Sequence, residues 1–117
     1  MSNEKDFIKR PWGYYQIILR DEGYIIKKIV ILPFQSISYQ LHNHRSEHWV
    51  VVSGVASIIK GKKKILLNTG ESIFTPLGVK HKISNDTETN LEIIEIQQGE
   101  KISEEDIVRF DDQYGRK

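Results

Sequence analysis

The stretch that decides the fold is QLHNHRSEHWVVVSG, residues 40 to 54. It holds three of the four histidines of the chain and continues into an apolar run that Gly54 closes. Successive side chains of a strand point to opposite faces, so an extended segment here places Gln40, His42 and His44 on one face. Two imidazoles in that arrangement can share a metal ion. The alternative is a polar strand edge whose histidines contact only water.

The composition is that of a single globular domain. A chain of 117 residues can bury one core but not two independent ones. The 17 Lys+Arg and 16 Asp+Glu residues nearly balance, which argues against a nucleic-acid-binding module. The absence of cysteine excludes disulfides and thiolate-bound zinc. The N-terminus has no apolar leader, and no apolar run approaches the ~20 residues of a membrane span, so we expect a cytoplasmic domain without a membrane partner.

Turn signals recur along the chain and predict an all-β sandwich or barrel of about eight to ten short strands. The clearest expected strands are YYQIIL (14–19), YIIKKIVIL (24–32) and LEIIEIQQ (91–98). We expect one domain over residues 1–117, with a lead-in before a core at about 11–98. In the C-terminal segment, 99–117, Ser103 precedes acidic residues, which predicts a short helix or a tail. The aromatic residues of this segment predict that it packs on the barrel.

The fourth histidine, His81, lies in GESIFTPLGVKHKISN, residues 70 to 85. Pro76 and Gly78 predict a tight turn that redirects the chain just before this histidine. If a barrel closes, the turn brings His81 beside the histidines of the first stretch. Together with an acidic residue, these side chains form a nitrogen and oxygen site for a divalent ion. Zinc, manganese, iron, cobalt and nickel all accept such ligands.

The two stretches resemble the two sequence motifs of the cupin fold. Residues 70 to 85 fit the second motif, G-x5-P-x-G-x2-H-x3-N, at every fixed position, and residues 42 to 54 resemble the first, H-x-H-x(3,4)-E-x6-G. The gap from His44 to Glu47 is shorter than the motif by at least one residue. Counting back from the closing glycine selects Glu47 as the acid ligand, whereas counting forward selects His48. We prefer Glu47, because the glycine anchors the strand register.

A closer resemblance is to the type II phosphomannose isomerases, whose cupin domain is often fused behind a mannose-1-phosphate guanylyltransferase domain. It rests on the first stretch, on RPWGYY at residues 10 to 15 and on GEKISEEDIVRFDDQYGR at residues 99 to 116, and it covers nearly the whole chain. The resemblance implies a cupin, or double-stranded β-helix, fold and a mannose-6-phosphate isomerase activity. In that activity, mannose 6-phosphate and fructose 6-phosphate interconvert through a cis-enediol, within carbohydrate metabolism such as GDP-mannose biosynthesis. Cupin resemblance and an exposed β edge also favour a homodimer.

The resemblance implies a first set of residues that bind a divalent metal, with zinc preferred over manganese, cobalt, nickel and iron. These ligands are His42, His44, Glu47 and His81. A second set binds the small-molecule sugar phosphate, and it comprises Gln40, Arg45, Lys80 and Lys27. Gln40 is also a further candidate for a metal ligand, because it shares a strand face with the two histidines of the first stretch.

The catalytic candidates are Arg45, His48 and Arg116. His48 is the expected base, although strand alternation turns it away from Glu47. Arg45 is expected to hold the phosphate or the enediolate, and its alternative is an ion pair with Glu47. The proposed role of Arg116 rests on the resemblance alone, which implies that the tail folds over the mouth of the site. Lysines such as Lys80 most often extend to water.

Other activities remain open on the general cupin pattern. A metal-dependent oxygenase uses similar ligands, a sugar-nucleotide epimerase uses a similar barrel, and a non-catalytic cupin uses the pocket only to hold sugar. The HR-x-EHW sequence and the YGR ending favour the isomerase. No glycine-rich nucleotide loop precedes the first stretch, so we expect isomerase activity without the guanylyltransferase.

Overall fold

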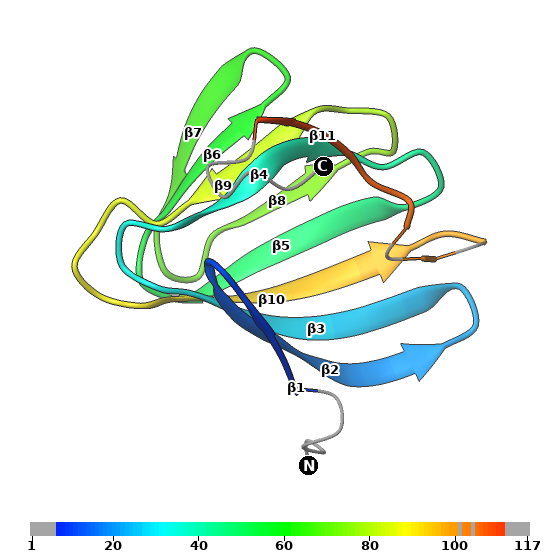
Figure 1. Cartoon of the computed structure of the whole chain (residues 1–117), viewed down its shortest axis with the longest axis horizontal. Coiled ribbons are helices and arrows are strands. Elements are labelled where there is room, and N and C mark those ends of the chain that lie inside the picture. The colour runs from blue at the N-terminus through cyan, green and yellow to red at the C-terminus, as the bar shows by residue number, and fades with distance from the viewer. Residues whose placement is uncertain (1–6, 101, 104, 112–117) are drawn as a thin grey trace.

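The computed structural model describes residues 7–100, 102, 103 and 105–111, and the proposed role of Arg116 lies outside them. Within these residues the chain forms strands and no helix (Figure 1). The described residues therefore contain no helix that could cross a membrane. The strands are β1 (Phe7–Arg10), β2 (Gly13–Asp21), β3 (Tyr24–Ile31), β4 (Ser36–Leu41), β5 (Ser46–Ser53), β6 (Ala56–Lys60), β7 (Lys63–Leu67), β8 (Ser72–Thr75), β9 (His81–Ser84), β10 (Leu91–Gln98) and β11 (Val108–Asp111). The all-β prediction is therefore confirmed.

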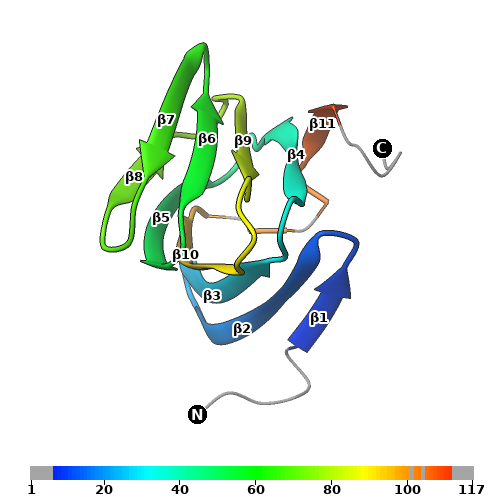
Figure 2. The same ribbon diagram turned by 90° about the vertical axis from the view of Figure 1, so that its left-hand side faces the viewer.

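Two antiparallel sheets face each other. One has the order β1-β2-β3-β10-β5-β8 and the other β11-β4-β9-β6-β7. Figure 2 shows that β1 and β11, which form one edge of each sheet, lie on the same side of the molecule. Alternate residues of the central strands point between the sheets, as the burial pattern of β10 shows. The core that they form is aromatic and β-branched, and it includes Trp12, Tyr15, Ile31, Trp49, Val51, Ile58, Ile83 and Ile93.

The first strand begins earlier than expected. Residues 7 to 10, which we expected to be a lead-in, pair with β2 in the register Phe7↔Gln16 to Arg10↔Gly13. The RPWG turn therefore joins two strands of a hairpin and does not merely precede the first one. The reason is visible in the sequence FIKR, whose apolar residues suit the edge of a sheet that continues through β2.

The helix that we expected after Ser103 is wrong within the described residues. Ser103 accepts a hydrogen bond from the backbone N–H of Glu105 at its hydroxyl (3.1 Å) and one from Asp106 at its carbonyl (3.1 Å). These bonds complete a single turn, after which the chain becomes extended and β11 pairs with β4. A capping residue promotes whatever turn follows it, but pairing with the free edge of β4 decides the conformation beyond that turn.

Candidate metal centre

Three buried side chains from three parts of the chain meet between the sheets. His42 follows the last residue of β4, Glu47 lies on β5 and His81 opens β9. Their candidate ligand atoms all lie within 4.8 Å of one another. Two backbone relationships hold them together: β4 pairs with β9 in the register Gln40↔His81, and the N–H of Gly78 donates to the carbonyl of His42 across 2.7 Å.

The carboxylate of Glu47 lies between the two imidazoles. Its Oε1 is 3.0 Å from Nε2 of His81, and its Oε2 is 3.5 Å from Nε2 of His42. The centroids of the two imidazole rings are 5.1 Å apart. Two nitrogens and a carboxylate directed at one point form a ligand set that divalent zinc and its neighbours accept.

The outer nitrogen of each imidazole is fixed by a backbone carbonyl. Nδ1 of His42 lies 2.6 Å from the carbonyl oxygen of Asp106, and Nδ1 of His81 lies 3.0 Å from that of Val79. A carbonyl only accepts, so each Nδ1 carries the proton and each Nε2 is the nitrogen presented to Glu47. Metal-binding histidines are commonly oriented in this way. Among the described residues, Nε2 of His81 is a buried nitrogen without an aligned hydrogen-bond partner, and a bound ion would satisfy it.

Arg45 completes the group as a buried cation. Its Nη2 lies 3.0 Å from Oε2 of Glu47 and 3.2 Å from Nε2 of His42, and its Nη1 donates to the carbonyl of Ser103. The ion pair with Glu47 that the sequence offered as the alternative is thus present, although it is buried and not on the surface. The guanidinium uses lone pairs that a metal ligand needs, so an ion bound there must displace it.

The charges of the group favour the ligand forms of His42 and Glu47, but they favour the protonated form of His81. Burial lowers the pKa of His42, which keeps its imidazole neutral near pH 7. Burial opposes ionisation of Glu47, but His81, Arg45 and His42 together outweigh it and lower the pKa of that carboxyl. Burial likewise opposes the protonation of His81, yet the Glu47 carboxylate raises its pKa above the ordinary value. The metal-free group therefore holds a proton that an incoming cation would replace.

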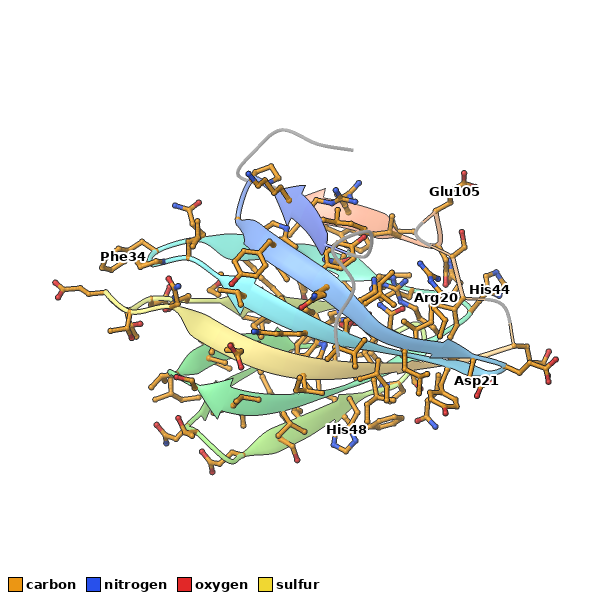
Figure 3. All side chains as sticks on the ribbon, turned by 90° about the horizontal axis from the view of Figure 1, so that it is seen from below. Arg20, Asp21, Phe34, His44, His48 and Glu105 are labelled. Carbon is orange, nitrogen blue, oxygen red and sulfur yellow. The ribbon has the colours of Figure 1, made fainter. Side chains whose placement is uncertain are left out.

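His44 does not join the group, which corrects the four-ligand prediction. Its side chain is exposed, and its backbone N–H donates to the Asp106 carboxylate at 2.8 Å. Figure 3 shows it at the same end of the molecule as Glu105. The prediction assumed a strand that continues through His44, but β4 ends at Leu41 and a loop follows. Strand alternation therefore stops before the second histidine.

His48 also lies outside the group. It is on β5 next to Glu47, and successive strand residues face opposite ways, so it points to the outer side of the sheet (Figure 3). There it lies opposite Phe74 of the neighbouring strand β8, and the centroids of the two rings are 6.1 Å apart. The expectation that His48 is the base does not fit this placement.

A pocket of about 90 Å³ contains the group. Side chains from both sheets line it, and four of them are cationic: Arg10, Lys27, Arg45 and Arg109. Gln40 is buried, lines the pocket and lies opposite His81 in the register of β4 and β9; its predicted substrate-binding role stays a prediction. Lys80 is not among the residues that line this pocket; its Nζ lies 4.1 Å from the ring centroid of Phe110.

Arg10 and Arg109 were missed in the sequence, and so were two polar residues of the pocket on β10. Glu95 and Gln97 on β10 are buried and line the pocket. Oε2 of Glu95 accepts a hydrogen bond from Nε1 of Trp49, and its Oε1 accepts one from Nε2 of Gln97, both at 2.7 Å. The signal was available: along LEIIEIQQ the inward positions change from Leu91 and Ile93 to a glutamate and a glutamine.

Comparison with known proteins places this chain in a family. The model of the family described as mannose-6-phosphate isomerase C-terminal matches residues 2–112. A mannose-1-phosphate guanylyltransferase of Salmonella montevideo is 48% identical over 110 residues, and the xanthan biosynthesis protein XanB of Xanthomonas campestris is 44% identical over 109. Each match covers 93% of this chain and 23% of the relative, so the chain spans about a quarter of the length of these proteins.

Solved structures identify the fold. An RmlC-like cupin from Shewanella frigidimarina superposes with a TM-score of 0.72 at 19% identity, covering 85% of this chain and 86% of the cupin. The two facing sheets are therefore a cupin barrel, as the two motifs predicted. At this level of identity the likeness concerns the fold alone.

Proposed function

This chain belongs to the mannose-6-phosphate isomerase C-terminal family, and on that premise we propose that it is a metal-dependent aldose–ketose isomerase. Its substrates are mannose 6-phosphate and fructose 6-phosphate, which interconvert through a cis-enediol. The observation that carries the proposal is the buried His42, Glu47 and His81 group inside a pocket with cationic side chains. An enediol needs charge stabilisation at its oxygens, and a sugar phosphate needs fixed cations.

His42, Glu47 and His81 would hold the ion, with zinc as the first choice and manganese, cobalt, nickel and iron as ions that suit the same ligands. When bound, the ion supplies Lewis acidity to the O1 and O2 oxygens of the sugar. The protein contributes the orientation of the ligands, because the carbonyls of Asp106 and Val79 fix both imidazoles. A divalent ion held by these three residues would keep coordination positions open for a further ligand.

We assign the phosphate of the substrate to three cationic side chains of the pocket, one each from β1, β3 and β11. Arg10 and Lys27 both lie against Tyr15: Nη2 of Arg10 is 3.5 Å from its hydroxyl, and Nζ of Lys27 is 4.3 Å from its ring centroid. Arg109 reaches the pocket from β11. Arginine suits phosphate because its planar fork donates two parallel hydrogen bonds. These residues replace Lys80 in the predicted set, and Lys27 stays in it.

The guanylyltransferase name of the Salmonella relative is not carried over. The region matched here is 23% of that protein, and the matching family is described by its isomerase activity. The homodimer remains a prediction, which sedimentation of the purified chain would test.

A coupled assay for fructose 6-phosphate formed from mannose 6-phosphate tests the proposal. The chain should be assayed with zinc, manganese, cobalt or nickel, after chelation, and as the His42→Ala variant. His44→Ala is the matched control, because it removes an exposed histidine two positions away. Turnover that requires the ion and His42 but not His44 is expected. No turnover with any of these ions would overturn the isomerase proposal.

A further inference from the structure

Glu95 lies one strand away from the metal group, on the same inner face. Glu95 is on β10, the strand between β3 and β5. In the backbone register it lies opposite Lys27 of β3 on one side and opposite Trp49 of β5 on the other. Glu47 is two residues from Trp49, so Glu95 and Glu47 are diagonal neighbours across β5 and β10. Such neighbours are roughly 7–8 Å apart. This spacing describes the backbone positions; the side chains of Glu95 and of the metal group line the same pocket, so a sugar bound at the metal group would lie in the space that Glu95 also lines.

The carboxyl of Glu95 is held by partners that suit both of its protonation states. Trp49 donates to Oε2, and an indole N–H can only donate, so this bond fixes the orientation of the group. The amide of Gln97 donates to Oε1. Turned by half a rotation, the same amide presents its oxygen, which has no hydrogen-bond partner among the described residues, to a protonated Oε1. A carboxyl group that takes and returns a proton needs hydrogen-bond partners that fit both its ionised and its protonated form.

The two histidines and the second glutamate that line the pocket are already engaged by other groups. His42 and His81 use Nδ1 on backbone carbonyls and direct Nε2 at Glu47, and Glu47 is paired with Arg45. Charged groups act on Glu95 from the strands around it: Lys27 and Arg45 favour its anion, and Glu47 opposes it. Burial and the charge of Glu47 together raise the pKa of Glu95 to about 7, which is the range in which a general base works best near neutrality.

We propose that Glu95 is the catalytic acid–base that carries the proton between C2 and C1 of the sugar, a role that rests on the proposed isomerase function. The carboxylate takes the proton from C2 of mannose 6-phosphate. The C2–H electrons form the C1–C2 double bond, and the carbonyl electrons move to O1. The carboxylic acid then returns the proton to C1, and the hydroxyl proton passes from O2 to O1 as the C2 carbonyl forms. All atoms and electrons balance without a further reagent.

The test compares Glu95→Gln with Glu92→Gln. A glutamine at 95 can still accept from Trp49 and donate to a turned Gln97, so it keeps the local structure and removes only the proton carrier. Glu92 is on the same strand, on the outer face, where it pairs with Lys28 at 3.5 Å, so its substitution controls for a lost charge on β10. Both variants and the parent are incubated with zinc and mannose 6-phosphate in D2O. Proton NMR then follows isomerisation and deuterium uptake at C1 and C2.

We expect Glu95→Gln to lower kcat by about 100-fold or more and to abolish deuterium uptake, while zinc content and fructose 6-phosphate binding by calorimetry stay at the parent level. Glu92→Gln should match the parent in every measurement. An active parent together with a Glu95→Gln variant that keeps turnover within about threefold overturns the role of Glu95 alone. A parent that is inactive with zinc, manganese, cobalt and nickel overturns the isomerase function and, with it, this role.

Discussion

The Nδ1 atom of His42 lies 2.6 Å from the carbonyl oxygen of Asp106, although 64 positions separate the two residues in the chain. The carboxylate of Asp106 also accepts hydrogen bonds from the backbone N–H groups of Asn43 (2.9 Å) and His44 (2.8 Å). Burial opposes ionisation of this carboxyl, but the two N–H groups hold its pKa below the ordinary value. The segment before β11 therefore fixes the loop that carries His42.

Asp106→Ala should weaken metal binding without unfolding the chain. The substitution keeps the backbone carbonyl but removes the carboxylate that holds the loop, and loss of such an outer partner costs about tenfold in metal affinity. The free energy of unfolding should fall by about 1 kcal/mol. Zinc affinity, measured by competition with a chelating dye, checks the prediction. Asp86→Ala, at an exposed turn, serves as the control, and an Asp106→Ala affinity equal to it would contradict the role.

Arg45→Gln should have the opposite effect on metal binding. The guanidinium occupies lone pairs of His42 and Glu47, so its removal should tighten zinc binding by about tenfold, or 1.4 kcal/mol. The metal-free protein should lose about 3 kcal/mol of stability, because Glu47 keeps a buried charge with one partner fewer. The same dye competition and urea unfolding measure both effects, with the exposed Arg20 as the site of a matched Arg20→Gln control. Weaker zinc binding would mean that Arg45 supports the ligands and does not compete with the ion.

Glu95 should make the metal-free protein less stable as the pH rises. Burial, with the charge of Glu47, raises its folded-state pKa to about 7 from an ordinary value of 4.5. Between these values the folded chain keeps a proton that the unfolded chain has released, so the free energy of unfolding falls as the pH increases. This loss should approach about 3 kcal/mol for Glu95 alone and should be absent in Glu95→Gln.

Urea unfolding of both proteins with a chelator, at about pH 5 and about pH 8, measures the difference. The comparison between parent and variant removes the contribution of His81, which both proteins share. Parallel pH dependences of the two proteins would show that Glu95 has no raised pKa in the folded state.

The sequence predicted the meeting of His42, Glu47 and His81 because local signals determine it. Gly54 closes the strand of Glu47, and the Pro76–Gly78 turn delivers His81. The N–H of Gly78 binds the carbonyl of His42 directly. Each motif lies within one short segment, so its residues and their spacing can be recognised in the sequence without knowledge of the rest of the fold.

The remaining features depend on contacts between distant segments. His44 was expected in the site because alternation was extended past the end of β4, where Asp106 and Gly99 determine the path of the chain. A Cβ on Gly99 would lie 2.1 Å from the carbonyl oxygen of His44, so only glycine lets the loop pack this closely. Glu95 is different: its inward polar position follows from alternation along β10, but it belongs to neither of the two histidine motifs.

The most direct test of the catalytic centre compares two histidine variants of equal size change. Purified parent, His81→Ala and His48→Ala proteins are stripped with a chelator and reloaded with zinc, and the interconversion of mannose 6-phosphate and fructose 6-phosphate is followed in each. We predict that His48→Ala regains the parent rate, whereas His81→Ala binds no stoichiometric zinc and shows no turnover. Zinc-dependent turnover in His81→Ala at the parent rate would contradict the assignment of the buried group as the catalytic centre.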